Sequence, residues 1–229
     1  ICGVAMIEIK FTCGKEIAQK FPPVPANNYK PSWYSKLDTY LDNEQTFPTV
    51  KKCMPVYDAM TSGYIMFNAV DQDIHTQPNF DEGTEGFARY YPEGWSEFSE
   101  QEGHPFAQCP VGQPKDYMVI SVPWQIKTPP GYSCIIQKPY YHFDNRFEVM
   151  TAIIDTDVID VPWHNWPAKI FEHNFTIKAG EPVAQIIPFK RDDWNMNIEI
   201  DTSIMTQDTI CNTERDGYAK IMHNKKRFK

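Results

Sequence analysis

The central stretch of the chain, residues 128–191, consists of short apolar runs separated by turn-forming residues. Proline and glycine fill the turn at residues 129–131 (PPG), and Ala-Gly makes another at residues 179–180. Apolar runs bounded in this way have the length of strands and are too short for most helices. Turns that recur every ~8–12 residues are typical of sandwiches and barrels. The stretch therefore predicts a mainly β fold of the jelly-roll type.

The composition favours the same fold class. The chain has 19 Pro but only 11 Gly, and 14% of its residues are aromatic. Many prolines between short apolar runs indicate many short elements joined by stiff connections, which favours an all-β over a helical architecture. At 229 residues the chain can bury a full-sized core, so we predict a single domain over residues 1–229.

The N-terminal part is predicted to contain a strand, a connector and a short helix. Within residues 1–50, the alternating residues 6–12 (MIEIKFT) have the period of a half-buried strand. The proline- and aromatic-rich residues 21–34 follow as an extended connector. Residues 50–61 (VKKCMPVYDAMT) predict a short helical segment, which ends at a Ser-Gly breaker.

The β core is predicted to span residues 51–194, with a long loop at residues 71–114. That loop is rich in Gly, Glu, His and Pro, and a loop of such length in a compact domain is usually functional or faces a partner. Mixed helical spacing over residues 203–223 predicts a C-terminal helix. We therefore expect residues 195–229 to form a C-terminal helical extension.

Charge and cysteine content limit the partners and the location. The net charge of −8 would repel nucleic acid and anionic membranes, so we expect neither as a partner. No apolar run approaches the ~20 residues that span a bilayer. A chain of 229 residues does not need disulfides to stabilise its core, and no pair of its six cysteines has CxxC spacing, so we expect reduced thiols and a cytoplasmic location.

One group of residues has the composition of an iron site. His142 and Asp144 form an HxD pair, and His173 lies downstream. Two imidazoles and one carboxylate on one face hold non-haem iron in oxygenases, with open positions for oxygen and a co-substrate such as 2-oxoglutarate. The surrounding KPYYHFDN segment resembles a loop more than a strand, which counts against this hypothesis.

An acidic corner offers a second candidate site. Asp155, Asp157 and Asp160 lie in IIDTDVID, where they could bind magnesium or supply a general base. The alternative is a solvated turn between two strands, a place where Asp is favoured in any case. The chain has no phosphate-binding loop, dinucleotide fingerprint or nucleophile elbow. Apart from magnesium at this corner, we expect no cofactor.

The acidic corner and the later turn resemble the dUTP pyrophosphatase and dCTP deaminase superfamily. The matching text is AIIDTDVID at residues 152–160 and FTIKAGEPVAQIIPF at residues 175–189. The resemblance implies a dUTPase-like β-clip fold, commonly trimeric, with Asp155 as the water-activating carboxylate. In an enzyme of this kind the candidate substrate-binding residues are Tyr132, Arg146 and Arg191. The sequence departs from the family pattern, since QKPYYHFDN stands in place of the Arg-Ser-Gly phosphate segment.

Three further segments resemble an uncharacterised family of marine tailed phages, large viruses and some bacteria. They are KKCMPVYDAMTSGYIM at residues 51–66, WQIKTPPGYSCIIQKP at residues 124–139 and EPVAQIIPFKRDDW at residues 181–194. The resemblance implies a viral or marine-microbial source, and with it a location inside the host cell.

Three functions are compatible with these observations. The leading hypothesis is a non-enzymatic β-domain that binds a protein partner or builds an assembly, in a phage context and as a homo-oligomer such as a trimer. The second is a metal-dependent nucleotide-processing enzyme with a dUTPase-like fold. The third is an iron/2-oxoglutarate oxygenase. The missing phosphate segment places the binding hypothesis first.

Overall fold

The computed structural model describes residues 7–14, 16–79, 84–90, 117–161, 164–172, 174–200 and 223–229. The chain groups into two compact units. The first, here called the β unit, comprises Ile1–Val24 and Gly63–Lys190; the second unit comprises Pro25–Ser62 and Arg191–Lys229. Within the described ranges, no helix has the length and apolar character needed to cross a membrane.

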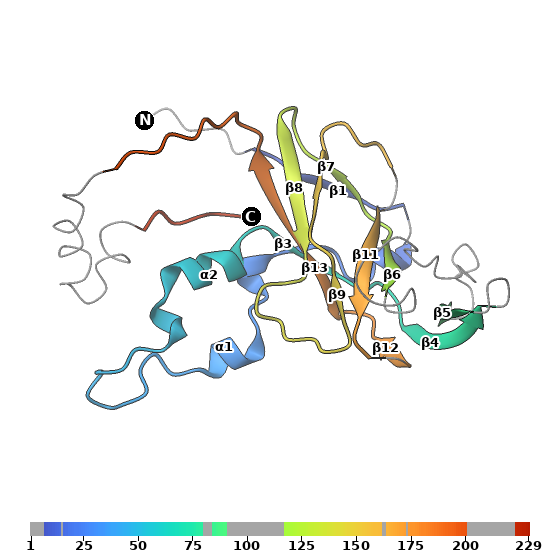
Figure 1. Ribbon diagram of the computed structural model, residues 1–229, viewed down its shortest axis with the longest axis horizontal. Helices are drawn as coiled ribbons and strands as arrows, with labels where there is room; N and C mark the ends of the chain where they lie inside the picture. Colours follow the sequence, from blue (N-terminus) through green and yellow to red (C-terminus); the bar gives the residue numbers. More distant parts are fainter. Residues whose placement is uncertain are drawn as a thin grey trace. The chain divides into compact units, whose positions relative to one another are not determined.

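The β unit is built on an antiparallel sheet with β13 (Pro182–Lys190) at its centre (Figure 1). β13 pairs on one side with β8 (Tyr132–Gln137) and on the other with β3 (Tyr64–Phe67). β10 (Ala152–Ile154) pairs with the far side of β8, and β2 (Val24–Pro25) lies at the opposite end of the strand order.

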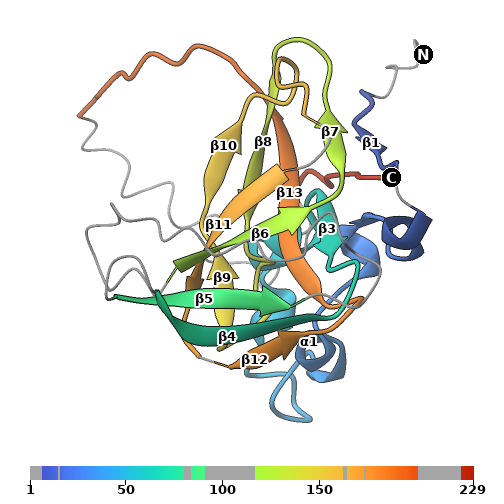
Figure 2. The same cartoon turned by 90° about the vertical axis from the view of Figure 1, so that its right-hand side faces the viewer.

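Smaller antiparallel sheets complete the β unit. Figure 2 shows β6 and β11 crossing over the face of β8 and β13. A two-stranded sheet pairs β1 (Lys10–Thr12) with β7 (Gln125–Lys127). A three-stranded sheet has the strand order β6 (Tyr117–Val122), β11 (His164–Ile170) and β9 (Phe147–Val149). Another has the order β12 (Phe175–Ile177), β4 (Gln72–Asn79) and β5 (Thr84–Tyr90). The predicted mainly β architecture is confirmed at this level.

One hydrophobic core joins these sheets. It takes Met66 from β3, Ile126 from β7, Trp166 from β11 and Ile177 from β12, all nearly or fully buried. Burial alternates along β11, where every second side chain from His164 onward faces inward, as the period of a strand requires. The short apolar runs of the sequence become strands because each has one face to bury in this shared core.

The second unit contains the helices. α1 (Ser32–Lys36) precedes a 3₁₀ turn at Val50–Lys52, and α2 (Met54–Thr61) follows it. Cys53 has an extended backbone and separates the turn from α2. The helical segment predicted for residues 50–61 is thus confirmed, in two pieces. Its end at Thr61 is the predicted one, immediately before the Ser-Gly breaker.

One expectation needs correction, and a second falls mostly outside the described ranges. The loop predicted for residues 71–114 is not structureless, because β4 and β5 form an antiparallel hairpin in its first part. β4 has few apolar residues, but Ile74 is fully buried and lies opposite Phe175 of β12, which explains how a polar segment is held as a strand. In the predicted helical extension, residues 195–200 and 223–229 are neither helix nor strand. The helix predicted over residues 203–223 falls on residues outside the described ranges, except for His223.

Candidate functional site

The carboxylates of the acidic corner are hydrogen-bonded to neighbouring strands and turns. Asp155 follows β10 directly, and its Oδ1 accepts a hydrogen bond from Ser133 Oγ of β8 at 2.6 Å. Asp157 Oδ2 accepts from the backbone N–H of Gly131 at 2.8 Å. Asp160 Oδ1 accepts from Gln125 Nε2 of β7 at 2.7 Å and lies 3.2 Å from Lys127 Nζ. Each carboxylate therefore has its own partner, on a different segment.

The predicted magnesium site has no geometrical counterpart in the described part of the chain. There, no three His, Cys, Asp or Glu side chains are grouped as a bound metal would require. Asp155, Asp157 and Asp160 are instead directed to Ser133, Gly131 and β7 respectively. Binding of magnesium at the corner remains a prediction from the sequence.

Beneath the corner lies a small buried polar group. Thr156 is fully buried, and its Oγ1 is 2.7 Å from Thr128 Oγ1 and 3.4 Å from the thiol of Cys134. Burial raises the pKa of Cys134 to about 11, although the hydrogen bond from Thr156 opposes the shift. The thiol thus stays protonated at neutral pH, which suits a core residue and excludes an activated nucleophile.

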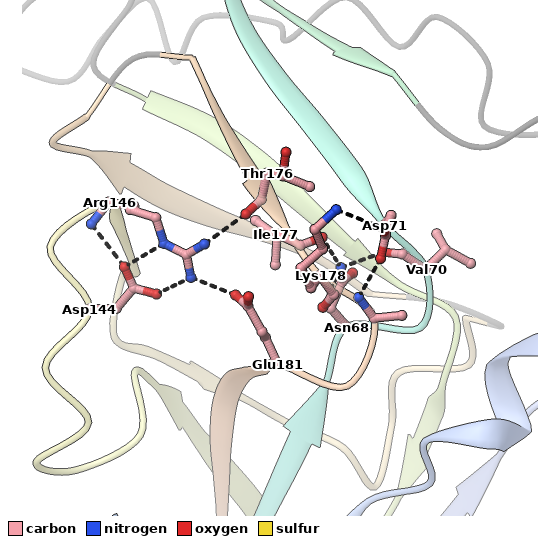
Figure 3. Close-up of polar contacts among 10 residues, drawn as sticks. Asn68, Val70, Asp71, Asp144, Arg146, Thr176, Ile177, Lys178 and Glu181 are labelled. Carbon is pink, nitrogen blue, oxygen red and sulfur yellow. Dashed lines mark hydrogen bonds and ion pairs between the residues drawn. The ribbon is translucent and has the colours of Figure 1, made fainter.

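Arg146 is the centre of a cluster of polar contacts in the β unit (Figure 3). Its Nε and Nη2 donate to the two carboxylate oxygens of Asp144, at 3.0 and 2.7 Å. Nη2 also donates to Glu181 Oε2 at 2.5 Å, and Nη1 donates to the carbonyl of Thr176 in β12 at 2.7 Å. The guanidinium carbon lies 5.7 Å from the centre of the Phe175 ring, within cation–π range.

The electrostatics of this cluster favour its charged state. Although burial opposes the shift, the hydrogen bonds and positive charge of Arg146 hold the pKa of Asp144 below its ordinary value. The bonds to Asp144 in turn raise the pKa of Arg146 further, so the guanidinium is charged at every relevant pH. Four of its five N–H groups donate to protein acceptors in the bonds above, so a two-pronged contact with a phosphate would require at least one of these bonds to break.

A second set of hydrogen bonds, with one ion pair, connects the turn between β12 and β13 to the residues that follow β3. Asn68 Nδ2 donates to the carbonyl of Ile177 at 2.9 Å, and the Gly180 N–H donates to the Asn68 carbonyl at 2.8 Å. Asp71 accepts from the Ala179 N–H and pairs with Lys178, both at 2.9 Å. The bond from Ala179 is the main reason that the pKa of Asp71 is lowered. These groups fix the turn. The sequence predicts the turn itself, but sequence analysis did not single out Asn68, Asp71 or Lys178.

The residues of the two enzyme hypotheses have other partners in the structure, lie in the second unit or fall outside the described ranges. Of the predicted iron ligands, Asp144 is committed to Arg146, the backbone N–H of His142 bonds to Pro139, and His173 is outside the described ranges. Of the predicted substrate-binding residues, Arg146 is held by the cluster above. Tyr132 is half-buried and its backbone carbonyl accepts from Thr128, while Arg191 belongs to the second unit.

His164 is the buried titratable group whose behaviour with pH is simplest to predict. Its ring stacks on Trp166, its side chain is 5% exposed, and its Nε2 has no hydrogen-bond partner among the described residues. Burial disfavours the charged imidazolium and lowers the pKa of His164.

We expect this histidine to make the protein less stable in mild acid. In the unfolded chain it takes up a proton below its ordinary pKa of about 6.5, whereas the folded state resists protonation until lower pH. The free energy of unfolding should thus fall below pH ~6.5, with a slope of up to about 1.4 kcal/mol per pH unit. Urea unfolding at pH 5.5 and 7.5 measures the effect. In His164→Phe, which retains a ring against Trp166, this difference should shrink; an unchanged difference would contradict the assignment.

Comparison with known proteins leaves the function to be inferred from the residues themselves. The chain matches no protein-family model, and a search of the curated proteins gives no match.

Proposed function

We propose that this chain is a non-catalytic β-domain that works by binding and self-assembly through an apolar surface beside β10. The observation that carries the proposal is the exposure of large aliphatic side chains there. Ile153 is 67% and Val158 71% exposed, and Met150, Ile159 and Val161 are each more than a third exposed. We call these five residues the β10 corner surface.

Two physical arguments support a binding role for this surface. Single exposed apolar side chains are ordinary, but five within residues 150–161 form a concentration of the kind that marks interaction sites. Burying one such aliphatic side chain fully is worth about 1.5–3 kcal/mol. Among the described strands, β10 is also the last in the order of its sheet, so its outer edge pairs with no other described strand and could pair with another chain.

The polar contacts of the β unit argue against the nucleotide-enzyme alternative. Of the two arginines predicted to bind the substrate, Arg146 is already bound by Asp144 and Glu181. The corner carboxylates serve as acceptors for Ser133 and Gly131. The antiparallel sheets that share one core support a jelly-roll-like fold, and the sequence resemblance leads us to propose the dUTPase-like kind, as an oligomer in a viral assembly.

Sedimentation velocity over roughly 1–100 μM tests the proposal. We expect the wild-type chain to self-associate, and Ile153→Asp/Val158→Asp to raise the dissociation constant by more than about tenfold. Both residues are exposed, so the melting temperature should change little. Leu41→Asp/Phe47→Asp is the matched control, because these side chains are 77% and 62% exposed in the second unit.

The contrary outcome is ligand binding without association. A monomer at all concentrations that is stabilised by a nucleotide with Mg²⁺, or by Fe²⁺ with 2-oxoglutarate, would overturn the proposal. A ligand at a hundredfold excess over its dissociation constant stabilises the folded state by about 2.7 kcal/mol, which a thermal-shift assay detects easily. Loss of that stabilisation in Asp155→Asn would assign the ligand to the acidic corner.

A further inference from the structure

The segment that follows β13 has the sequence of a strand. Residues 194–200 read WNMNIEI, in which Trp194, Met196, Ile198 and Ile200 alternate with polar residues. Because successive side chains of an extended chain point to opposite faces, this alternation places all four apolar side chains on one face. The sequence is therefore that of a strand with one face to bury.

This segment has no strand partner in the described part of the chain. Figure 1 draws it as a long trace that is neither helix nor strand. Its four apolar side chains are 92%, 82%, 76% and 94% exposed, in chain order. On the other face, Asn197 Nδ2 donates to Glu199 Oε1 at 2.9 Å, which shows that side chains two residues apart share a side. We call residues 193–200 the apolar arm.

We propose that the apolar arm docks on a second copy of this chain, along the open edge of β10, and that the second copy returns its own arm in the same way. The inference rests on the proposed function, since the β10 corner surface is the acceptor. The inference adds to the proposed function what binds the β10 corner surface, namely a second copy of this chain, and which segment of that copy makes the contact, namely its apolar arm.

The amount of exposed apolar surface matches what a stable dimer needs. A fully exposed side chain of this size presents on the order of 200 Å², so each arm offers roughly 700 Å². Because an interface area is counted over both partners, one docked arm with its receiving surface would bury roughly 1,400 Å², within the ~1,200–2,000 Å² of a standard interface. Two exchanged arms would bury roughly 2,800 Å², which lies in the range of stable homodimers.

A second copy is favoured over a different protein because one chain carries both complementary parts. The arm has the alternation of a strand but no strand partner among the described residues, and β10 is an edge strand that carries the exposed Ile153. Main-chain pairing along β10 would satisfy the polar groups of both, as in other cases of strand addition. Two copies that exchange arms form a closed two-fold dimer, in which each arm has a β10 edge and each β10 edge has an arm.

A complementation experiment tests the exchange. The arm variant is Met196→Asp/Ile198→Asp and the edge variant is Ile153→Asp/Val158→Asp. Each alone should raise the dimer dissociation constant by roughly 30-fold, because a charge replaces two apolar contacts at each docked arm. An equimolar mixture should recover part of the association. In the mixed dimer the intact arm of one copy meets the intact edge of the other.

The opposite face of the arm provides the control. Asn195→Asp/Asn197→Asp adds the same number of negative charges to the polar face, and this variant should associate as the wild type does. Circular dichroism and the melting temperature of each variant check that the fold is kept. We expect it to be kept because the apolar side chains that the arm and edge variants replace are exposed and lie outside the core.

Each contrary result has its own meaning. A wild-type chain that is monomeric at all concentrations rules out exchange between copies, including the case in which the arm folds onto its own edge. If the arm variant associates normally while the edge variant does not, the arm is excluded and the proposed function survives. If both variants are weakened but their mixture recovers nothing, the arm does not dock on β10.

Discussion

Gly63→Ala should lower the free energy of unfolding by about 4 kcal/mol, a large part of the roughly 5–15 kcal/mol that holds a typical domain folded. Gly63 has a φ of 70°, a conformation that residues with a Cβ rarely adopt. A Cβ at this position would lie 2.0 Å from the carbonyl oxygen of Ile186 and 2.9 Å from its carbonyl carbon. Both are backbone atoms of β13, so the clash can be relieved only by moving the central strand.

Gly131→Ala separates the two contributions to this effect. Gly131 also has a positive φ, 86°, but a Cβ built there meets nothing within 4 Å. It should therefore show only the backbone strain, about 1–2 kcal/mol. Urea unfolding followed by circular dichroism compares the two variants with the wild type. Equal losses would mean that β13 does not approach residue 63 as closely as described here.

The best sequence predictions were those that depend on local chemistry. The turns at residues 129–131 and 179–180 were recognised from their residue types, and Gly131 and Gly180 indeed have positive φ values, 86° and 85°. The strand predicted to follow the first turn is β8, and the one predicted to follow the second is β13. A turn and the strand after it are encoded within about ten residues, so a single sequence is sufficient to find them.

Elements held by distant partners were not predicted. β4 reads QDIHTQPN, and its only strong apolar residue is Ile74. It is a strand because it pairs with β5 on one side and with β12, about a hundred residues later, on the other. Strand formation depends on such neighbours more than on intrinsic preference, so a polar strand of this kind resembles a loop in the sequence.

The candidate site shows the same limit. Asp144 and Arg146 were recognised from the sequence, but they were assigned to different hypotheses, one as an iron ligand and the other as a phosphate-binding residue. In the structure they bind each other, and Glu181, 35 residues away, completes the cluster. Residue types indicate what a side chain can bind; which partner it finds depends on the packing of β9, β12 and β13.

Arg146→Ala should be the next most damaging change, with a loss of about 3 kcal/mol in the free energy of unfolding at pH 7. It leaves the carboxylates of Asp144 and Glu181 without their shared cation, and the Thr176 carbonyl without its donor. The estimate lies at the low end for a buried pair because these side chains are 27–32% exposed. Arg146→Lys should recover only part of the loss, since an ammonium cannot reproduce the two-pronged contact with Asp144.

The pH dependence of this loss distinguishes a structural arginine from a ligand-binding one. The lowered pKa of Asp144 contributes stability that is present above the ordinary carboxyl pKa of about 4 and is lost as pH falls through the lower, folded value. In Arg146→Ala that contribution is absent, so the difference in the free energy of unfolding between the variant and the wild type should shrink below pH ~4.

A double-mutant cycle with Asp144→Asn, read by urea unfolding, isolates the interaction between Arg146 and Asp144 and should give a coupling energy of about 1–2 kcal/mol. A loss below about 1 kcal/mol for Arg146→Ala, with no coupling to Asp144, would mean that the guanidinium is held too weakly to be structural. In that case Arg146 would be available to a phosphate, and the nucleotide hypothesis would regain its missing cation.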